Sequence, residues 1–134
     1  MGALFDKELN IPVRGISERT TKSNDINNGQ TITLFEENNN SGCIFHWWLT
    51  TTVDGDYEPS NDLQLKIYYD GEIKPAVDIP LAKFFSILLG ESAFTTKINN
   101  SALKVLPQNA FNCYFPLPFN KIKITLTNKG KKDI

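Results

Sequence analysis

The chain has 134 residues, of which 40% are hydrophobic and 22% charged, and its formal net charge is −1. This length and balance are typical of one globular domain with a sizeable core and exclude an intrinsically disordered chain. The near-neutral charge argues against nucleic-acid binding, and no run approaches the ~20 apolar residues of a membrane span. The first residues carry acidic charge and lack the apolar run of a secretory signal, so we expect synthesis in the cytoplasm.

The N-terminal part of the chain is polar and rich in turn-forming residues. We therefore expect an arm or loop over residues 1–29 and one folded domain over residues 30–134. The first strand of that domain alternates, which predicts Ile32 and Leu34 on one face and Phe35 on the other.

The middle of the chain predicts three further strands. Cys43–Thr52 is β-branched and aromatic, and Leu63–Tyr69 shows the clearest alternation of a half-buried strand. Asp70 and Gly71 are the residues of a tight hairpin turn, so we expect the chain to return as a strand over Ile73–Ile79. The prolines that flank this return strand place it at a sheet edge, because proline cannot donate to a ladder.

The C-terminal half continues the same pattern. Leu81–Leu89 could form one or two helical turns, and strands are expected over Ala93–Ile98, Asn112–Phe115 and Lys121–Asn128. Six to eight short strands with almost no helix predict an all-β fold, a single jelly-roll β-sandwich with at most one short helix. The predicted shared core includes Leu65, Ile67, Ile122, Ile124 and Leu126.

The only histidine, His46, is the first candidate for chemistry. It could act as a general base or as a ligand-stacking ring, but a packed or interface histidine is the simpler interpretation, since no nucleophile motif stands near it. The two cysteines, Cys43 and Cys113, are too few and too far apart for a disulfide framework or a zinc site, so we expect buried free thiols.

Acidic side chains gather in one loop and could serve as a glycosidase acid pair or as weak calcium ligands. Acidic loops are more often simply solvated, so we expect no catalytic, cofactor-binding or metal-binding residue in this chain, and no cofactor. The carboxylates of this loop are Asp54, Asp56, Glu58 and Asp62.

Pairs of adjacent aromatic residues point to a binding surface. Neighbouring residues of a strand face opposite sides, so neither Trp47 and Trp48 nor Tyr68 and Tyr69 can share one core. One ring of each pair should lie on an outer face, where sugars or other subunits bind. Trp48, Tyr68 and His46 are therefore the candidate residues for contact with a subunit or ligand.

Three sequence blocks closely resemble the signature of glycoside hydrolase family 172. One is a strand ending in Tyr-x-Asp-Gly-Glu followed by Pro-x-Val-x-x-Pro-Leu-x-x-Phe-Phe, which fits residues 68–72 and 75–85. The others are Gly-x-Ile-x-x-x-Trp at Gly42–Trp48 and Tyr-x-Pro-x-Pro-Phe at Tyr114–Phe119. The resemblance covers roughly residues 17–130, with blocks in the family's order and spacing.

The resemblance implies a jelly roll from a family that carries two in tandem, assembles as trimers or hexamers, and cleaves fructofuranosides or arabinofuranosides. Its architecture is also similar to that of double jelly-roll viral capsid proteins. The family's catalytic acid pair belongs to the second jelly roll, whereas this sequence reaches Ile134 just after the first. We therefore expect no residue to inherit those roles, and Glu72 belongs to the turn motif.

These observations favour a non-catalytic jelly-roll protein that assembles with itself, as a virion component or another structural or surface protein. We expect a homotrimer that buries Trp48 or Tyr68 at the subunit contact, because the resemblance and the surplus rings both point to packed jelly rolls. Two alternatives stay open at this point: a fragment of a family 172 furanosidase, and a glycan-binding module that uses the same rings.

Overall fold

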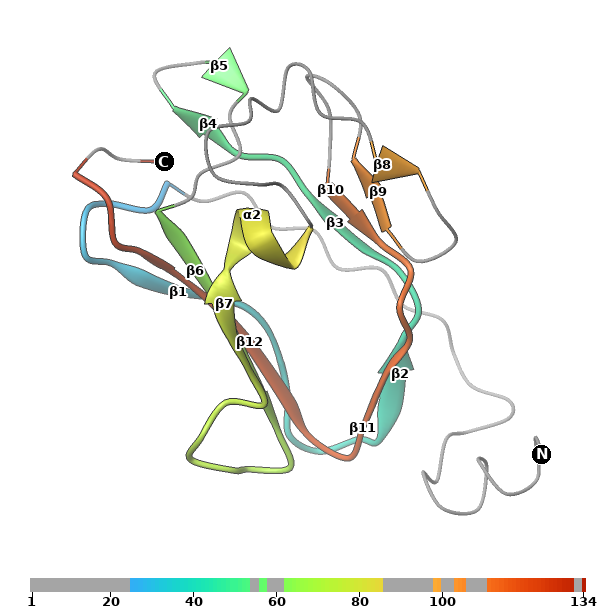
Figure 1. Ribbon diagram of the computed structural model, residues 1–134. Coiled ribbons are helices and arrows are strands. Elements are labelled where there is room, and N and C mark those ends of the chain that lie inside the picture. Colours follow the sequence, from blue (N-terminus) through green and yellow to red (C-terminus); the bar gives the residue numbers. More distant parts are fainter. Residues whose placement is uncertain are drawn as a thin grey trace.

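Two antiparallel sheets face each other across one core (Figure 1). The computed structural model describes residues 25–53, 56–57, 62–85, 98–99, 103–105, 111–131 and 134. The first sheet has the order β1 (Thr31–Glu37), β12 (Ile122–Asn128), β6 (Leu63–Tyr69) and β7 (Val77–Pro80). The second has the order β3 (Trp47–Leu49), β10 (Phe111–Cys113), β9 (Leu103–Val105) and β8 (Ile98–Asn99).

Two strand pairs and one short helix complete the described fold. The pair β2 (Gly42–Ile44) and β11 (Leu117–Phe119) continues β3 and β10 toward the bottom of Figure 1. The pair β4 (Thr52–Val53) and β5 (Asp56–Tyr57) stands apart from the two four-stranded sheets. The short helix α2 (Leu81–Phe84) lies between those two sheets. The predicted all-β sandwich with one short helix is therefore confirmed.

The core forms where alternation along β6 and β12 turns every second side chain inward. All five residues predicted for the shared core are at most 3% exposed, which confirms that prediction: Leu65, Ile67, Ile122, Ile124 and Leu126. The antiparallel register sets Leu65 opposite Leu126 and Ile67 opposite Ile124, so these apolar side chains meet on one face.

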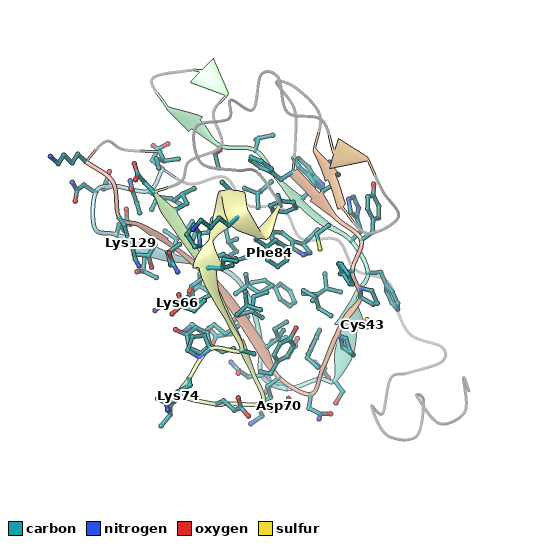
Figure 2. All side chains as sticks on the ribbon, in the orientation of Figure 1. Cys43, Lys66, Asp70, Lys74, Phe84 and Lys129 are labelled. Atoms are coloured by element: carbon teal, nitrogen blue, oxygen red, sulfur yellow. The ribbon has the colours of Figure 1, made fainter. Side chains whose placement is uncertain are left out.

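Helix α2 closes the end of the core between the sheets. Phe85, directly after the helix, is fully buried and lies 5.1 Å from Phe111, 5.1 Å from Phe84 and 5.4 Å from Trp47 between ring centroids. Figure 2 shows Phe84 directed into this interior. These rings join helix α2 to β3 and β10, so the helix ties the two sheets together.

The first strand departs from simple alternation. Phe35 was predicted to face away from Ile32, but the register slips between Thr33 and Phe35, so that Phe35 pairs with Ile124. Such a bulge inserts one residue and reverses the facing of those that follow. Phe35 therefore packs against the core, with its ring 6.4 Å from that of Phe119.

Two predicted strands are shorter than the sequence suggested. The expected strand Cys43–Thr52 breaks into β2, β3 and β4, and the return strand begins at Val77 rather than Ile73. Pro75 precedes that start and has no N–H to give to a ladder. β7 does lie at the edge of its sheet, as the flanking prolines predicted.

Part of the expected N-terminal arm joins the domain. Ile26 is 4% exposed, and its backbone exchanges hydrogen bonds of 2.7 and 3.1 Å with that of Ile134. The boundary at residue 29 stays a prediction, because residues 1–24 lie outside the described part, as does most of the expected strand Ala93–Ile98. Within the described residues, no helix is long and apolar enough to span a membrane.

Candidate functional site: an aromatic patch at a strand bulge

The candidate site lies where one pair of strands passes from the second sheet to the β2–β11 pair. Trp47 pairs with Cys113 on the β3–β10 side, and Ile44 pairs with Leu117 on the β2–β11 side. Residues 45–46 therefore lie opposite residues 114–116, so one side carries an extra residue and the regular pairing is interrupted. We call this interruption the bulge. Side chains at a bulge leave the regular alternation, so they can be directed to solvent.

Large apolar side chains are exposed at this bulge. The exposed fractions are 68% for Phe45, 46% for Trp48, 38% for Tyr114 and 53% for Phe115. We call these four residues, together with His46, the aromatic patch. Exposed apolar surface of this kind is typical of partner or ligand surfaces rather than of a monomer's inert face.

His46 has two contacts that orient its ring within the aromatic patch. Its ring lies parallel to that of Tyr114, with centroids 4.3 Å apart and an interplanar angle of 1°. Its Nε2 lies 3.1 Å from Oδ1 of Asn112, so the tautomer protonated at Nε2 donates to that amide oxygen. His46 falls within the expected strand Cys43–Thr52, but it lies between β2 and β3, outside either strand.

Asn112 is the residue of this site that the sequence analysis missed. It lies opposite Trp48 in the β3–β10 register and also accepts the hydrogen bond from His46. A polar residue between Phe111 and Cys113, both buried, was a usable signal, since it marks the outer face of the same strand.

The two adjacent tryptophans take opposite faces of β3. Trp47 packs against the rings of Phe84 and Phe85, whereas Trp48 is on the outer face. The buried Nε1 of Trp47 has no hydrogen-bond partner among the described residues. The Trp47 Nε1 lies near the Cys113 thiol and lowers the pKa of that thiol. Burial raises the same pKa and is the larger effect.

The tyrosine pair lies in the first sheet, away from the aromatic patch. Tyr69 packs against the core, where burial raises the pKa of its phenol. Tyr68 lies on the outer face, opposite Lys123 of β12. The structure thus brings His46 together with Trp48 through Asn112 but places the third candidate, Tyr68, on a different sheet.

The Tyr-x-Asp-Gly-Glu block forms a tight turn. Asp70 and Gly71 have φ values of 52° and 77°, and the Glu72 N–H donates to the Tyr69 carbonyl over 2.9 Å. Positive φ at both central residues is the pattern of a type I′ turn. The Asp70 Oδ1 also accepts hydrogen bonds from the backbone N–H groups of Asn120 (3.1 Å) and Lys121 (2.9 Å).

The remaining candidate residues do not form a reactive site in the described part of the chain. Cys113 is buried and Cys43 half-buried, both are free, and burial raises the pKa of each thiol. Among the described residues no group of three or more potential metal ligands gathers. The side chains of Asp54, Asp56 and Glu58 fall outside the described part, and Asp62 is exposed.

Fold and patch together define an antiparallel β-sandwich with an exposed aromatic surface at a strand bulge. The family model described as GH172 domain-like matches residues 17–134, which is most of the chain. The chain therefore belongs to this GH172-related family, as the sequence blocks indicated. A search of curated proteins finds no match to it.

Proposed function

We propose that the chain is a non-catalytic, self-assembling β-sandwich with a structural role, and that the aromatic patch packs against a second copy in a homotrimer. The observation that carries this proposal is the exposure of Trp48 at 46%, beside three further exposed rings. Trp48 lies in β3, which pairs with β10, and the other three rings lie in short segments between paired strands, so the backbone loses little freedom when they are covered.

The energetics favour association through several rings at once. Full burial of one large apolar side chain contributes about 1.5–3 kcal/mol. Association costs roughly 4–15 kcal/mol in translational, rotational and side-chain freedom. One ring cannot offset that cost, whereas several partly exposed rings buried together on both sides of the contact reach the lower part of that range. Closed symmetry lets every subunit bury its patch, which supports the trimer over an open chain.

A structural role is also supported by what the signature residues do. Asp70 and Gly71 form a turn, Leu81 and Phe85 are fully buried, and Pro80 ends an edge strand. These residues account for much of the resemblance to family 172 without a catalytic task. A virion or surface assembly is the setting we propose for such a scaffold.

The assembly is tested by light scattering coupled to gel filtration at micromolar concentration. We expect three times the 15.1 kDa chain mass for the wild type. Trp48→Ser should give a monomer, whereas Ile73→Ser, which removes an apolar side chain that is 95% exposed outside the patch, should stay trimeric. A monomeric wild type, or a trimer unaffected by Trp48→Ser, would contradict the proposal.

The non-catalytic part of the proposal is tested by an activity assay. The purified chain should not hydrolyse nitrophenyl fructofuranosides or arabinofuranosides. Glu72 is exposed in the turn and is one of the two acidic residues of the Tyr-x-Asp-Gly-Glu motif. The other, Asp70, accepts hydrogen bonds from two backbone N–H groups. Turnover that persists through repurification and disappears in Glu72→Gln would overturn the non-catalytic proposal.

A further inference from the structure

A groove of about 410 Å³ lies on the outer face of the first sheet, away from both the core and the aromatic patch. Figure 2 shows Lys66 directed away from the interior on this side, opposite to Phe84. A volume of this size is in the range of small-molecule sites. The groove is lined by Thr31, Glu36, Asn38, Lys66, Tyr68, Gly71, Glu72, Lys121, Ile122, Lys123, Thr125 and Thr127.

Strand register arranges these side chains in rows across the sheet. Tyr68 of β6 lies opposite Lys123 of β12, and Lys123 lies opposite Glu36 of β1. In another row, Lys66 lies opposite Thr125. The same alternation that buries the apolar residues therefore sets one ring, amines, carboxylates and hydroxyls side by side on the opposite face.

Two of the three lysines that line the groove are in ion pairs, and the lining also contains two carboxylates, so the groove has little excess positive charge. Lys123 Nζ lies 3.8 Å from the Glu36 carboxylate, and Lys66 Nζ lies 3.6 Å from Asp78. A 2.6 Å hydrogen bond from Gln64 lowers the pKa of Asp78 and keeps it ionised beside Lys66. Long, partly exposed pairs of this kind contribute little energy, so a ligand's hydroxyl groups can replace them.

The floor of the groove is polar as well. Thr125 is only 5% exposed although it lies on the outer face, and the hydroxyls of Thr31 and Thr127 are 2.7 Å apart. Tyr68 is the aromatic side chain among the residues that line the groove. Its ring offers a flat apolar surface that is surrounded by hydrogen-bond donors and acceptors.

We propose that this groove binds a neutral oligosaccharide, with a sugar ring stacked on Tyr68 and its hydroxyls bound by the lysines, Glu36 and the threonines. A sugar presents both an apolar C–H face and hydroxyls that donate and accept, which matches the lining. A phosphate or nucleic acid would be favoured by a clear excess of cations, whereas the lining sets the carboxylates of Glu36 and Glu72 against its three lysines.

A protein partner fits this groove less well. The core of a protein interface is apolar and depleted of charge. The large exposed apolar residues of the described chain are Phe45, Trp48, Ile73, Tyr114 and Phe115, and none of them lines the groove. The groove is therefore a surface distinct from the aromatic patch, and its sugar binding does not depend on the proposed assembly.

The test is a titration followed by amide TROSY spectra of the full chain. The probes are maltotetraose, cellotetraose, xylotetraose, arabinotetraose and nystose, with inorganic phosphate and a heparin tetrasaccharide as anionic probes. We expect at least one neutral probe to shift amides of β1, β6 and β12, with a Kd of about 0.1–1 mM. Tyr68→Ala should raise that Kd about tenfold or more, by loss of the stacking surface.

Two controls separate the groove from the aromatic patch and from misfolding. Trp48→Ala should leave the Kd unchanged whether or not it alters the oligomer. Thr125→Val, which keeps the side-chain shape and removes a floor hydroxyl, should weaken binding if Tyr68→Ala fails to give dispersed spectra. The proposal is overturned if no neutral probe binds at about 10 mM, if shifts centre on residues 45–48 and 112–115, or if only the anionic probes bind.

Discussion

The turn at Asp70 gives the sharpest test of the claim that the family signature is structural. In Asp70→Ala, two backbone N–H groups, of Asn120 and Lys121, lose their carboxylate acceptor. Because Asp70 is exposed, each of these bonds contributes about 1 kcal/mol, which is below the usual range for charged acceptors. An alanine at φ 52° costs about 1 kcal/mol more, since the left-handed region is unfavourable for it. The expected loss is therefore about 3 kcal/mol.

Thermal and urea unfolding measure this loss directly. A destabilisation of this size corresponds to a fall in Tm of roughly 10 °C for a domain of this length. Asp70→Asn should cost only about 1 kcal/mol, because asparagine tolerates positive φ and keeps one acceptor oxygen. Glu72→Ala is the matched control in the same turn and should stay within about 0.5 kcal/mol of wild type. If Asp70→Ala is equally neutral, the turn does not fix the β6 end to the start of β12, and the reasoning fails.

Three further predictions concern the core, pH and the thiols. Phe85→Ala should destabilise the domain by about 3–5 kcal/mol in urea unfolding, whereas Ile73→Ala should change it by less than about 0.5 kcal/mol; equal effects would refute the assigned core. Backbone N–H groups lower the pKa of Glu37 below its ordinary 4.5, so its stabilisation is complete above pH 4.5 and is lost as pH falls through the lowered value. The Tm gap between wild type and Glu37→Gln should therefore close in acid, and a gap that widens would contradict the sign. Burial raises the pKa of both thiols, so at pH 8 a maleimide should label Cys113 far more slowly in the native state than in urea. In the native state the half-buried Cys43 should react faster than the buried Cys113. Equal native rates would place Cys113 at the surface.

The sheet core could be predicted from sequence because one periodicity governs it. Along β6 and β12 every second residue is apolar, and no insertion disturbs the count, so the inward residues followed directly. Thr125 shows the limit of that reasoning. Alternation with the inward Ile124 and Leu126 puts Thr125 on the outer, groove side, yet it is 5% exposed because β12 is flanked by β1 and β6. Alternation gives the face of a side chain but not what neighbouring strands place over it.

The candidate site was predicted only in part because bulges carry no sequence signal as regular as alternation. In β1 the extra residue returned Phe35 to the core side, and between β2 and β3 another bulge took His46 out of any strand. The separation of Trp48 from Tyr68 could not be predicted either. It depends on which strand joins which sheet, and that pairing is set by contacts far apart in the chain.

The family signature contains two kinds of residue, and the difference between them locates the surfaces. Gly71, Leu81 and Phe85 are explained by a turn or by burial, so folding alone accounts for them. Trp48 and Tyr68 also occupy signature positions, yet neither belongs to the buried core. A large ring on an outer face adds little to the stability of its own domain, because it keeps much of its contact with water. Signature rings that the fold does not bury are best explained by contacts with something outside the domain. Trp48 lies among apolar rings and suits another protein chain, whereas Tyr68 lies among amines, carboxylates and hydroxyls and suits a sugar.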